Sequence, residues 1–284
     1  MIIWLASYPK SGNTWVRSFL STVLYSQDGE NEFKHLSKIK QFPVSSQFEN
    51  FNIDYKNIDQ LSSNWIKAQQ VINLDGKIKL FKTHHVNCKI KDKAFTNLDN
   101  TLGVIHIVRD PRNVITSIKN HYALTSIEAA KNFIFDENML IKRPKKLTGV
   151  EDDEIIPTLI SSWKTNYFSW KNKSKNYLLI KYEDLQNSPH ETFYSIANYV
   201  SKLMGLKLEK DKIEKAINSN SFDSLKKLEE KGMFREYKHR VDEGKKFRFF
   251  NLGPRNTWQS ILDESIVNEI QAKFSKEMKE LNYI

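Results

Sequence analysis

Short apolar runs alternate with polar turns along this chain and predict a repeating order of strand and helix. The first run, Ile2 to Ala6, has the length of a strand, and Pro9 and Gly12 then mark a tight turn. Beyond the turn, apolar residues recur at helical spacing, at Trp15, Val16, Phe19, Leu20, Val23 and Leu24. The pattern therefore predicts a buried strand that leads through a polar turn directly into a helix.

The same order returns further along the chain. Residues 77–85 alternate between polar and apolar side chains in their first half, which indicates a second strand. Residues 101–108 are almost continuously apolar, as expected of a strand buried on both faces, and Pro111 then opens another helix. The remaining predicted elements are a strand over residues 177–185, helices within residues 190–230 and a final helix after Asp263.

Two segments lack sustained periodicity. Aromatic residues within 26–75 are scattered among polar ones, and we expect them to pin loops or short helices to the core rather than to line a pocket. Residues 125–157 combine a basic and an acidic cluster, and we interpret them as an insertion or a lid over the ligand site. Together the elements predict a single domain over residues 1–284 with a P-loop-like α/β fold, a mostly parallel sheet of about 4–5 strands flanked by helices.

Composition and cysteine content narrow the class of protein. With 284 residues, 39% hydrophobic and 12% aromatic, the chain can bury a sizeable core. Its one cysteine, Cys88, excludes an intrachain disulfide and fits a reducing compartment. His84, His85 and Cys88 do not have the spacing of a zinc site, so no metal is expected. No apolar run approaches the roughly 20 residues that span a bilayer and no secretory leader is recognised, so we expect a cytoplasmic protein.

The net charge of +10, with an isoelectric point near 9.3, implies an anionic partner. Nucleic acid is the general interpretation of a basic chain, but the basic residues are spread from end to end without a recognisable nucleic-acid motif. A polyanionic cofactor, an acidic substrate or an anionic membrane surface would explain the same charge. The net charge alone does not choose among them.

The first turn has the chemistry of a phosphate site. The first N–H groups of a helix lack internal partners and carry the positive end of its dipole, so the turn before the helix attracts anions. The residues that add an ammonium group and hydrogen-bonding side chains there are Lys10, Ser11, Asn13 and Thr14. The nucleotide triphosphatase pattern Gly-x-x-x-x-Gly-Lys-Ser/Thr is absent, because the lysine precedes the single glycine, Gly12. An ordinary strand–turn–helix with a surface lysine is the alternative interpretation.

The segment Tyr8-Pro-Lys-Ser-Gly-Asn-Thr-Trp15 resembles the 5′-phosphosulfate loop of the cytosolic-type sulfotransferases, Tyr-Pro-Lys-Ser-Gly-Thr-Thr-Trp. Seven of the eight positions match, and Asn13 replaces a threonine. The resemblance implies an enzyme that transfers the sulfuryl group of 3′-phosphoadenosine 5′-phosphosulfate (PAPS) to an acceptor. It also implies that the donor is bound by Lys10, Ser11, Gly12, Asn13, Thr14 and Trp15.

A candidate base lies at the end of the second predicted strand. Ligands of open α/β sheets sit at the carboxyl ends of the strands, so Lys82 and His84 share the mouth of the first turn if both strands are parallel. Histidine has an unperturbed pKa suited to proton abstraction near neutrality, although most lone histidines are structural. The Lys-Thr-His triplet is similar to the family's strand end, whose histidine acts as general base. The resemblance therefore implies His84, rather than His85, as the base, and we assign charge stabilisation to Lys10 and Lys82.

The turn after residues 101–108 has the features of a second anion site. Arg109 stands just before the predicted helix, and an arginine can grip a phosphate through two hydrogen bonds. An ion pair between Arg109 and a neighbouring aspartate is the alternative. The segment resembles the family's 3′-phosphate site, an arginine followed eight residues later by a serine, which implies this role for Arg109 and Ser117. Two separated anion sites suit a cofactor that carries both 5′ and 3′ phosphates.

Weaker resemblances concern the nucleoside. Tyr182 lies in a segment similar to the one whose tyrosine reaches the adenine in the family. Phe222 falls at the position of an aromatic residue that stacks on the base, and Trp15 is then expected on the opposite face of the purine. Asn166 occupies the position of a histidine in the family's Ser-Trp-x-x-His helix.

The last family motif, Arg-Lys-Gly-x-x-Gly-Asp-Trp, is matched only in part near the end of the chain. Gly253 is kept, but Asn251 and Leu252 replace the Arg-Lys pair, so two cations are missing where the 3′-phosphate is expected. We expect Arg248 or Arg255 to supply the missing charge, a hypothesis based on their proximity in the sequence. The family's dimer signature is absent, which leaves the oligomeric state open.

Two other function classes stay open at this point. A P-loop kinase would act on ATP–Mg²⁺, although the position of Lys10 argues against it. A non-enzymatic basic protein would bind nucleic acid or acidic glycan through its charge and would not need His84. For a sulfotransferase, the sequence leaves the acceptor open among phenol, lipid, glycan and natural-product hydroxyls or amines, and we expect neither nucleic acid nor a metal as partner.

Overall fold

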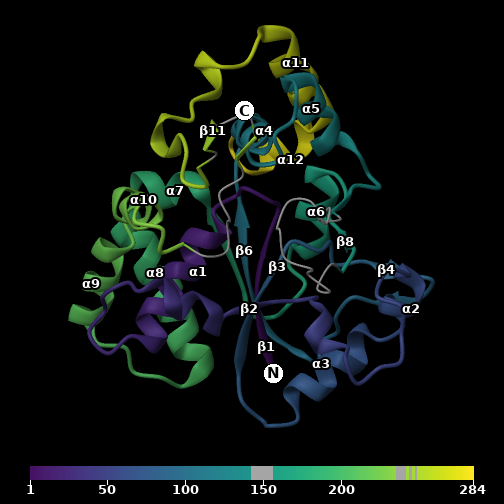
Figure 1. The fold of residues 1–284 in the computed structure, drawn as a ribbon, viewed down its shortest axis with the longest axis vertical. Helices are drawn as coiled ribbons and strands as arrows, with labels where there is room; N and C mark the ends of the chain where they lie inside the picture. Colours follow the sequence, from purple (N-terminus) through teal and green to yellow (C-terminus); the bar gives the residue numbers. More distant parts are fainter. Residues whose placement is uncertain (142–155, 235–240, 243–244, 247) are drawn as a thin grey trace.

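The computed structural model describes residues 1–141, 156–234, 241–242, 245–246 and 248–284. At its centre is a parallel five-stranded sheet in the order β2-β3-β1-β6-β9 (Figure 1). The strands are β1 (Ile2–Ser7), β2 (Lys40–Gln41), β3 (Lys79–Thr83), β6 (Thr101–Val108) and β9 (Tyr177–Lys181). The predicted P-loop-like α/β architecture with a parallel sheet is therefore confirmed.

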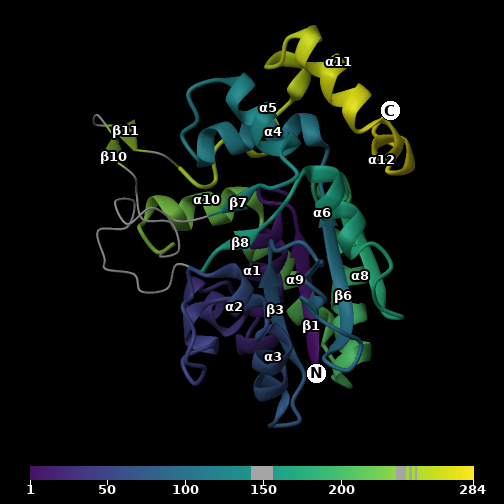
Figure 2. The same ribbon diagram turned by 90° about the vertical axis from the view of Figure 1, so that its right-hand side faces the viewer.

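Helices cover both faces of the sheet and its upper edge (Figures 1 and 2). One face carries α1 (Asn13–Tyr25), α7 (Tyr182–Asn187), α8 (Pro189–Met204), α9 (Lys210–Ser219) and α10 (Phe222–Glu230). The other face carries α2 (Ile58–Ser62), α3 (Trp65–Asn73) and α6 (Trp163–Trp170). Beyond the carboxyl ends of the strands lie α4 (Pro111–His121), α5 (Ile127–Phe135), α11 (Glu264–Lys273) and α12 (Ser275–Glu280).

Short elements fill the connections. Among the described residues, two-residue strands form the antiparallel pairs β4 (Lys89–Ile90) with β5 (Lys93–Ala94), β7 (Leu140–Ile141) with β8 (Thr158–Leu159), and β10 (Val241–Asp242) with β11 (Lys245–Lys246). Short 3₁₀ helices occupy Phe33–Lys38, Ser45–Gln47, Gly253–Arg255 and Trp258–Ser260. No helix in the described part of the chain is long and apolar enough to span a membrane.

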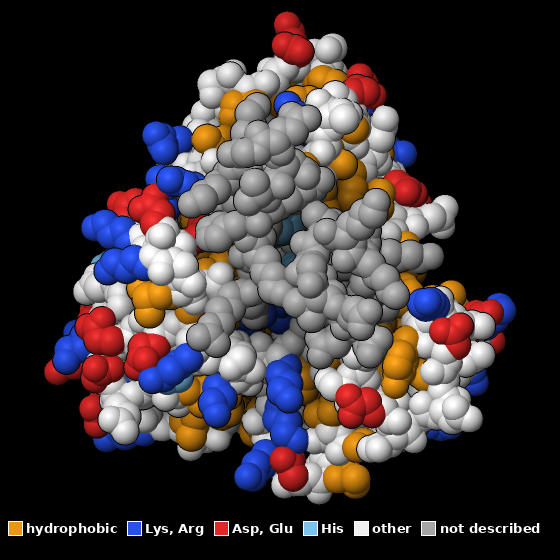
Figure 3. Space-filling model, viewed as in Figure 1, with side chains coloured by type: hydrophobic (Ala, Val, Ile, Leu, Met, Phe, Trp, Pro, Cys, Tyr) orange, Lys and Arg blue, Asp and Glu red, His pale blue; other side chains and the backbone are white. Residues whose placement is uncertain are grey.

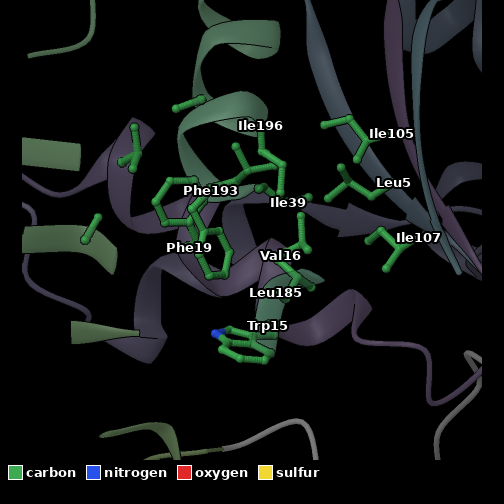
Figure 4. Close-up of a cluster of buried hydrophobic side chains, with 14 of the residues drawn as sticks. Leu5, Trp15, Val16, Phe19, Ile39, Ile105, Ile107, Leu185, Phe193 and Ile196 are labelled. Atoms are coloured by element: carbon green, nitrogen blue, oxygen red, sulfur yellow. The ribbon is translucent and has the colours of Figure 1, made fainter. Parts of the chain in front are cut away.

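Burial on both faces explains the apolar runs of the central strands. Ile3 and Leu5 of β1 pack toward α1 and α8, whereas Trp4 packs into the opposite layer against Phe42 and Trp170. Figure 4 shows the first of these cores, where Leu5, Ile105 and Ile107 of the sheet face Val16, Phe19, Phe193 and Ile196. Each large side chain buried in this way stabilises the fold by about 1.5–3 kcal/mol. A strand with no solvent-facing side has no place for alternating polar residues.

The two strand–turn–helix segments have clear local causes. Gly12 has a φ of 101°, and a β-carbon there would lie 2.7 Å from Cδ2 of Tyr182, so the turn before α1 requires glycine. At α4, the side chain of Asp110 accepts a hydrogen bond from the backbone N–H of Arg112, and Pro111 takes the first helical position. Both turns therefore depend on residue types within them, and the contact with Tyr182 adds a tertiary reason for glycine at position 12.

Several element boundaries differ from the sequence prediction. The predicted strand over residues 177–185 ends at Lys181, and Tyr182 begins α7, whose Leu185 is buried against α1. The expected final helix is divided into α11 and α12 at the buried Phe274. Asp263 takes the N-cap position of α11 as expected, although its side chain makes no capping hydrogen bond.

The segment expected to be an irregular insertion contains a helix. In α5, Ser126 accepts a capping hydrogen bond from the N–H of Ala129, and Ala130 and Ile134 are buried beneath the helix. The interpretation of residues 125–157 as irregular is thus wrong for α5, while residues 142–155 lie outside the described residues. The aromatic residues within 26–75 pack into the core as predicted, with Phe42, Phe48 and Trp65 fully buried.

Candidate active site

Strand alternation brings functional side chains to one edge of the sheet. Leu5 of β1 faces α1, and its register partners are Lys82 of β3 and Ile105 of β6. Side chains two positions apart on a strand share a face, so Ser7 and Lys82 project to the same side at the carboxyl ends of β1 and β3. Arg109, four positions after Ile105, follows β6 on that side as well.

A cavity of about 820 Å³ opens at this edge. Volumes of roughly 300–1,000 Å³ are usual for small-molecule sites. Among the residues predicted from the sequence, those lining it are Lys10, Gly12, Asn13, Thr14, Trp15, Lys82, His84, Arg109, Ser117, Tyr182, Phe222 and Gly253. Segments that are far apart in the sequence thus meet around one space.

The two predicted anion-binding turns touch each other. Nη1 of Arg109 donates a hydrogen bond of 3.0 Å to the main-chain oxygen of Lys10, and its guanidinium lies 3.9 Å from the ring centroid of Tyr182. Only 5% of the Arg109 surface is exposed. The turns after β1 and β6 therefore lie on the same side of the sheet and line the same cavity.

The predicted alternative for Arg109 is an ion pair with a neighbouring aspartate. In the structure the neighbouring aspartate, Asp110, pairs with Arg112 instead. Arg112 pairs with Asp110 over 2.6 Å, and both side chains are buried. Arg112 also donates to the main-chain oxygen of Tyr283 and lies 4.1 Å from the ring of Trp258, so it ties the carboxyl-terminal segment to α4. Arg112 is thus a structural residue, and of these two arginines it is Arg109 that lines the cavity.

Lys10 is held in an uncommon conformation inside the turn. Its φ is 68°, in the left-handed region, and its Nζ lies 3.8 Å from the ring centroid of Phe249. Burial lowers the pKa of Lys10 to about 7, and the Arg109 guanidinium contributes to this shift. An anion placed beside Lys10 opposes both effects and favours the charged ammonium.

His84 is held against the end of β1. Its Nδ1 lies 2.9 Å from the main-chain oxygen of Ser7 and 3.2 Å from Oγ of the same residue. A carbonyl oxygen can only accept, so Nδ1 carries the proton and Nε2 keeps its lone pair. Burial holds the pKa of His84 well below 6.5, and the Lys82 ammonium lowers it further. His84 is therefore neutral near pH 7 and has the tautomer of a proton acceptor.

The neighbouring His85 has a different environment. It is fully buried, stacks on Phe95 at 4.4 Å, and its Nδ1 bonds with the main-chain oxygen of Val86 at 2.7 Å. Burial lowers the pKa of His85 to about 4. Asn166, at the position of the family histidine, donates to the main-chain oxygen of His84 and so supports the turn that carries it.

The residues expected around the nucleoside also line the cavity. Trp15 donates through Nε1 to the main-chain oxygen of Asn220 and meets the ring of Tyr182 edge to face at 5.9 Å. A β-carbon at Gly253 would lie 2.2 Å from Cζ of Phe222, so the backbone at Gly253 rests directly on that ring. This close approach is a physical reason for glycine at position 253, where φ is +54°.

Three predicted residues are not among those lining the cavity. Ser11 is fully buried beneath the turn. Arg248 pairs with Glu230 over 2.8 Å at the surface, and Arg255 is exposed. Asn251 and Leu252, which replace the family's Arg-Lys pair, do line the cavity. The role of the two arginines in 3′-phosphate binding stays a prediction.

Sequence reasoning missed Arg17, which is 2% exposed and lines the cavity. Its charge contributes to the lowered pKa of His84. The signal was present, because Arg17 follows Asn13 by one helical turn and therefore shares its face of α1. The basic side chains in the described cavity wall are Lys10, Arg17, Lys40, Lys82 and Arg109, and this part of the wall contains neither Asp nor Glu.

The surface visible in Figure 3 has a more even mixture of basic and acidic side chains than the described cavity wall has. On the face shown in Figure 3, most Lys and Arg side chains of the described residues lie beside Asp and Glu side chains, apart from a short column of basic residues at the lower centre. The described cavity wall therefore concentrates positive charge more strongly than this part of the surface does. Such a wall suits a compact polyanion.

The family model and the similar proteins found by comparison are all sulfotransferases. The sequence model described as "Sulfotransferase domain" matches residues 2–282. Human Sulfotransferase 2A1 is 24% identical over 226 residues, a match that covers 78% of this chain and 65% of the human protein. Sulfotransferase 1B1 of Canis lupus familiaris is 23% identical over 279 residues, a match that covers 96% of this chain and 82% of the canine protein.

The fold is also shared with solved structures. The mouse sulfotransferase SULT7A1, crystallised in complex with PAP, superposes with a TM-score of 0.55 at 17% sequence identity. The superposition covers 97% of this chain and 84% of the mouse chain. At this identity the likeness shows a common fold.

Proposed function

This chain belongs to the sulfotransferase domain family, and we propose that it transfers the sulfuryl group of PAPS to a hydroxyl or amine of an acceptor. The observation that carries the proposal is the contact between the turns of Lys10 and Arg109, which line one cavity together with His84. A donor with two separated phosphate groups needs two anion sites that face the same space. The basic wall of the cavity supports a polyanionic donor.

In this proposal the donor lies across the two turns. The turn at Lys10 and the first N–H groups of α1 bind the 5′-phosphosulfate, and Arg109 with Ser117 binds the 3′-phosphate. Tyr182, Phe222 and Trp15 surround the purine. Arg109 then exchanges its hydrogen bond to the main-chain oxygen of Lys10 for one to phosphate, or keeps both through its several N–H groups.

His84 and the two lysines carry the chemistry. The acceptor oxygen or nitrogen attacks sulfur, one bond to sulfur forms, and the bond between sulfur and the bridging 5′-phosphate oxygen breaks in line. Nε2 of His84 takes the acceptor's proton, which its tautomer permits. Lys10 and Lys82 stabilise the charge that develops on the departing and equatorial oxygens.

A thermal-shift experiment tests the donor class. Adenosine 3′,5′-bisphosphate (PAP), the desulfated product, at 100 times its dissociation constant stabilises a binding protein by about 2.7 kcal/mol. We expect PAP to raise the melting temperature of this protein by several degrees and ATP–Mg²⁺ to leave it nearly unchanged. Stabilisation by ATP–Mg²⁺ alone would indicate a kinase. Stabilisation by neither, with steeply salt-dependent binding of polyanions, would indicate a basic adaptor.

Turnover tests the role of His84. Replacement of a positioned base typically costs roughly 10²–10⁴-fold in rate. His84→Ala should abolish sulfuryl transfer while PAP affinity stays close to that of the wild type. Full activity, or loss of PAP binding, would refute the assignment.

The acceptor belongs to the class of small molecules, lipids or glycans with a hydroxyl or amine group, and we place the reaction in the cytoplasm. No aromatic residue within 26–75 lines the cavity in the described residues; that part of the wall contains Ser37, Ile39, Lys40, Gln41, Pro43, Val44 and Ser46. Incubation of labelled PAPS with fractionated cell extracts, followed by identification of the labelled product, would name the acceptor.

A further inference from the structure

The side chain of Asn13 turns toward strand β1. Its Nδ2 donates to the main-chain oxygen of Leu5 over 2.9 Å and to Oγ of Ser7 over 3.1 Å. The carbonyl of Leu5 can only accept, so the nitrogen of the amide must face it, and this fixes the orientation of the group. Only 4% of the Asn13 surface is exposed, which limits competition from bulk water. Both amide hydrogens of Asn13 are thus committed to β1.

Ser7 connects Asn13 to the proposed base. Its Oγ accepts the hydrogen of Asn13 and lies 3.2 Å from Nδ1 of His84, and its main-chain oxygen lies 2.9 Å from the same nitrogen. A hydroxyl beside a histidine nitrogen either accepts from N–H or donates to the bare nitrogen. With hydrogens from Asn13 and His84 directed at its two lone pairs, the Ser7 hydroxyl hydrogen points elsewhere.

We propose that Asn13 is a positioning residue for His84, because its hydrogen bond keeps the Ser7 hydroxyl an acceptor toward Nδ1–H. This arrangement holds His84 in the tautomer whose Nε2 receives the proton of the sulfate acceptor. Without Asn13, the Ser7 hydroxyl is free to rotate and donate to Nδ1, which stabilises the opposite tautomer. The inference rests on the proposed role of His84.

A comparison with the threonine found in the family's loop shows why asparagine suits this task. A threonine hydroxyl has one hydrogen to donate, whereas the asparagine amide has two and reaches both Leu5 and Ser7. Asn13 is also the first residue of α1, whose N-terminal N–H groups are proposed to bind the 5′-phosphosulfate. A path of consecutive hydrogen bonds therefore links the donor-binding turn to the base.

The tautomer is measurable without an acceptor. Side-chain ¹⁵N chemical shifts of ¹⁵N-histidine-labelled protein distinguish a protonated from an unprotonated nitrogen, and His84→Gln identifies the His84 signals. We expect Nδ1 protonated and Nε2 unprotonated in the wild type, with and without PAP. Asn13→Ala should change the tautomer ratio roughly 2- to 10-fold toward Nε2–H, the size expected for one neutral hydrogen bond.

The double variant Asn13→Ala/Ser7→Ala is the decisive control. It removes the hydroxyl that is proposed to compete, while the main-chain oxygen of Ser7 remains, so the wild-type tautomer should return. An unchanged ratio in Asn13→Ala, or a double variant that fails to restore it, would overturn the inference. If Asn13→Ala does not fold, as judged by its thermal unfolding, Asn13→Leu replaces it, because it keeps the approximate size of the side chain and removes both amide hydrogens.

PAP affinity, measured on the same samples, separates this inference from the proposed function. A variant that loses PAP binding with an unchanged tautomer ratio would show that Asn13 acts on the phosphate alone, and the positioning role would be wrong. A wild-type protein that does not bind PAP would contradict the sulfotransferase proposal. The tautomer ratios would still decide whether Asn13 orients His84.

Discussion

The guanidinium of Arg109 and the main-chain oxygen of Lys10 are joined by a hydrogen bond of 3.0 Å, although the two residues are 99 positions apart. The contact places two cationic side chains of the cavity close together. Arg109 is the largest electrostatic cause, after burial, of the lowered pKa of Lys10. The two positive charges therefore repel each other, and an anionic ligand would reduce that repulsion.

Binding of PAP should take up a proton. The pKa of Lys10 is about 7 in this structure, so its side-chain amine is mostly neutral at pH 8 and mostly protonated at pH 6. Phosphate charge raises this pKa, because an opposite charge favours the charged form. We expect proton uptake approaching one per site at pH 8 and little from Lys10 at pH 6, measured by titration calorimetry in buffers of different ionisation enthalpy. Lys10→Met should lose the uptake; equal uptake at both pH values would contradict the assignment.

Replacement of Arg109 should weaken PAP binding. A hydrogen bond to a charged group is worth about 1.5–3 kcal/mol, so Arg109→Ala should reduce the affinity roughly 10- to 100-fold. Arg109→Lys keeps the charge but loses the planar fork, and we expect an intermediate loss. Calorimetry with PAP measures both effects. Lys279→Ala, at an exposed lysine of α12, is the control, and a similar loss there would show that Arg109 acts only through net charge.

Arg17 should set the pH range of catalysis. Its positive charge contributes to the low pKa of His84, so Arg17→Met should raise that pKa. A general base acts when it is unprotonated, and activity on the acidic side therefore rises with pH around the pKa of His84. The acidic limb of kcat/KM should move to higher pH in Arg17→Met. An unmoved limb would show that the two groups are not coupled.

The contact between Gly253 and Phe222 provides a steric test. Gly253→Ala would place a β-carbon 2.2 Å from the Phe222 ring, so the ring or the segment that contacts it must move. Gly205→Ala is the matched control, because Gly205 also has a positive φ of +64° but open space around the new β-carbon. Both variants should lose roughly 1 kcal/mol of stability from the backbone strain. Only Gly253→Ala should also weaken PAP binding, and equal affinities of the two variants would contradict a role for Phe222 in the site.

Arg248 and Arg255, near the last family motif, which this chain matches only in part, need a separate test. Arg248→Ala and Arg255→Ala should each weaken PAP binding if they replace the missing Arg-Lys pair. Because Arg248 pairs with Glu230 in this structure, its contribution requires that ion pair to open. Calorimetry at two salt concentrations measures the charge contribution. Wild-type affinity in both variants would show that neither arginine replaces the missing pair.

Local sequence patterns were sufficient to predict the central elements of the fold. The bounds predicted for β6 agree with the structure, because a strand buried on both faces requires a continuous apolar run. The turns at Gly12 and Pro111 were recognisable, since glycine and proline restrict the backbone in known ways. The helix α5 was missed because the period within residues 127–135 is short and its partners, such as Phe274, are distant in the sequence.

The chain by itself therefore determined the central strands β1, β3 and β6, the helices that follow β1 and β6, the two turns predicted to bind anions and, through a family resemblance, the histidine proposed as base at the end of β3. Only the tertiary structure decided that Arg109 lines the cavity while Arg112 pairs with Asp110, that Arg17 lies in the same wall, and that Asn13 turns toward β1. Secondary structure follows from apolar periodicity and backbone restriction, which act between near neighbours. The direction of a polar side chain depends on which donors and acceptors the packed sheet brings within reach, and these come from residues far apart in the sequence.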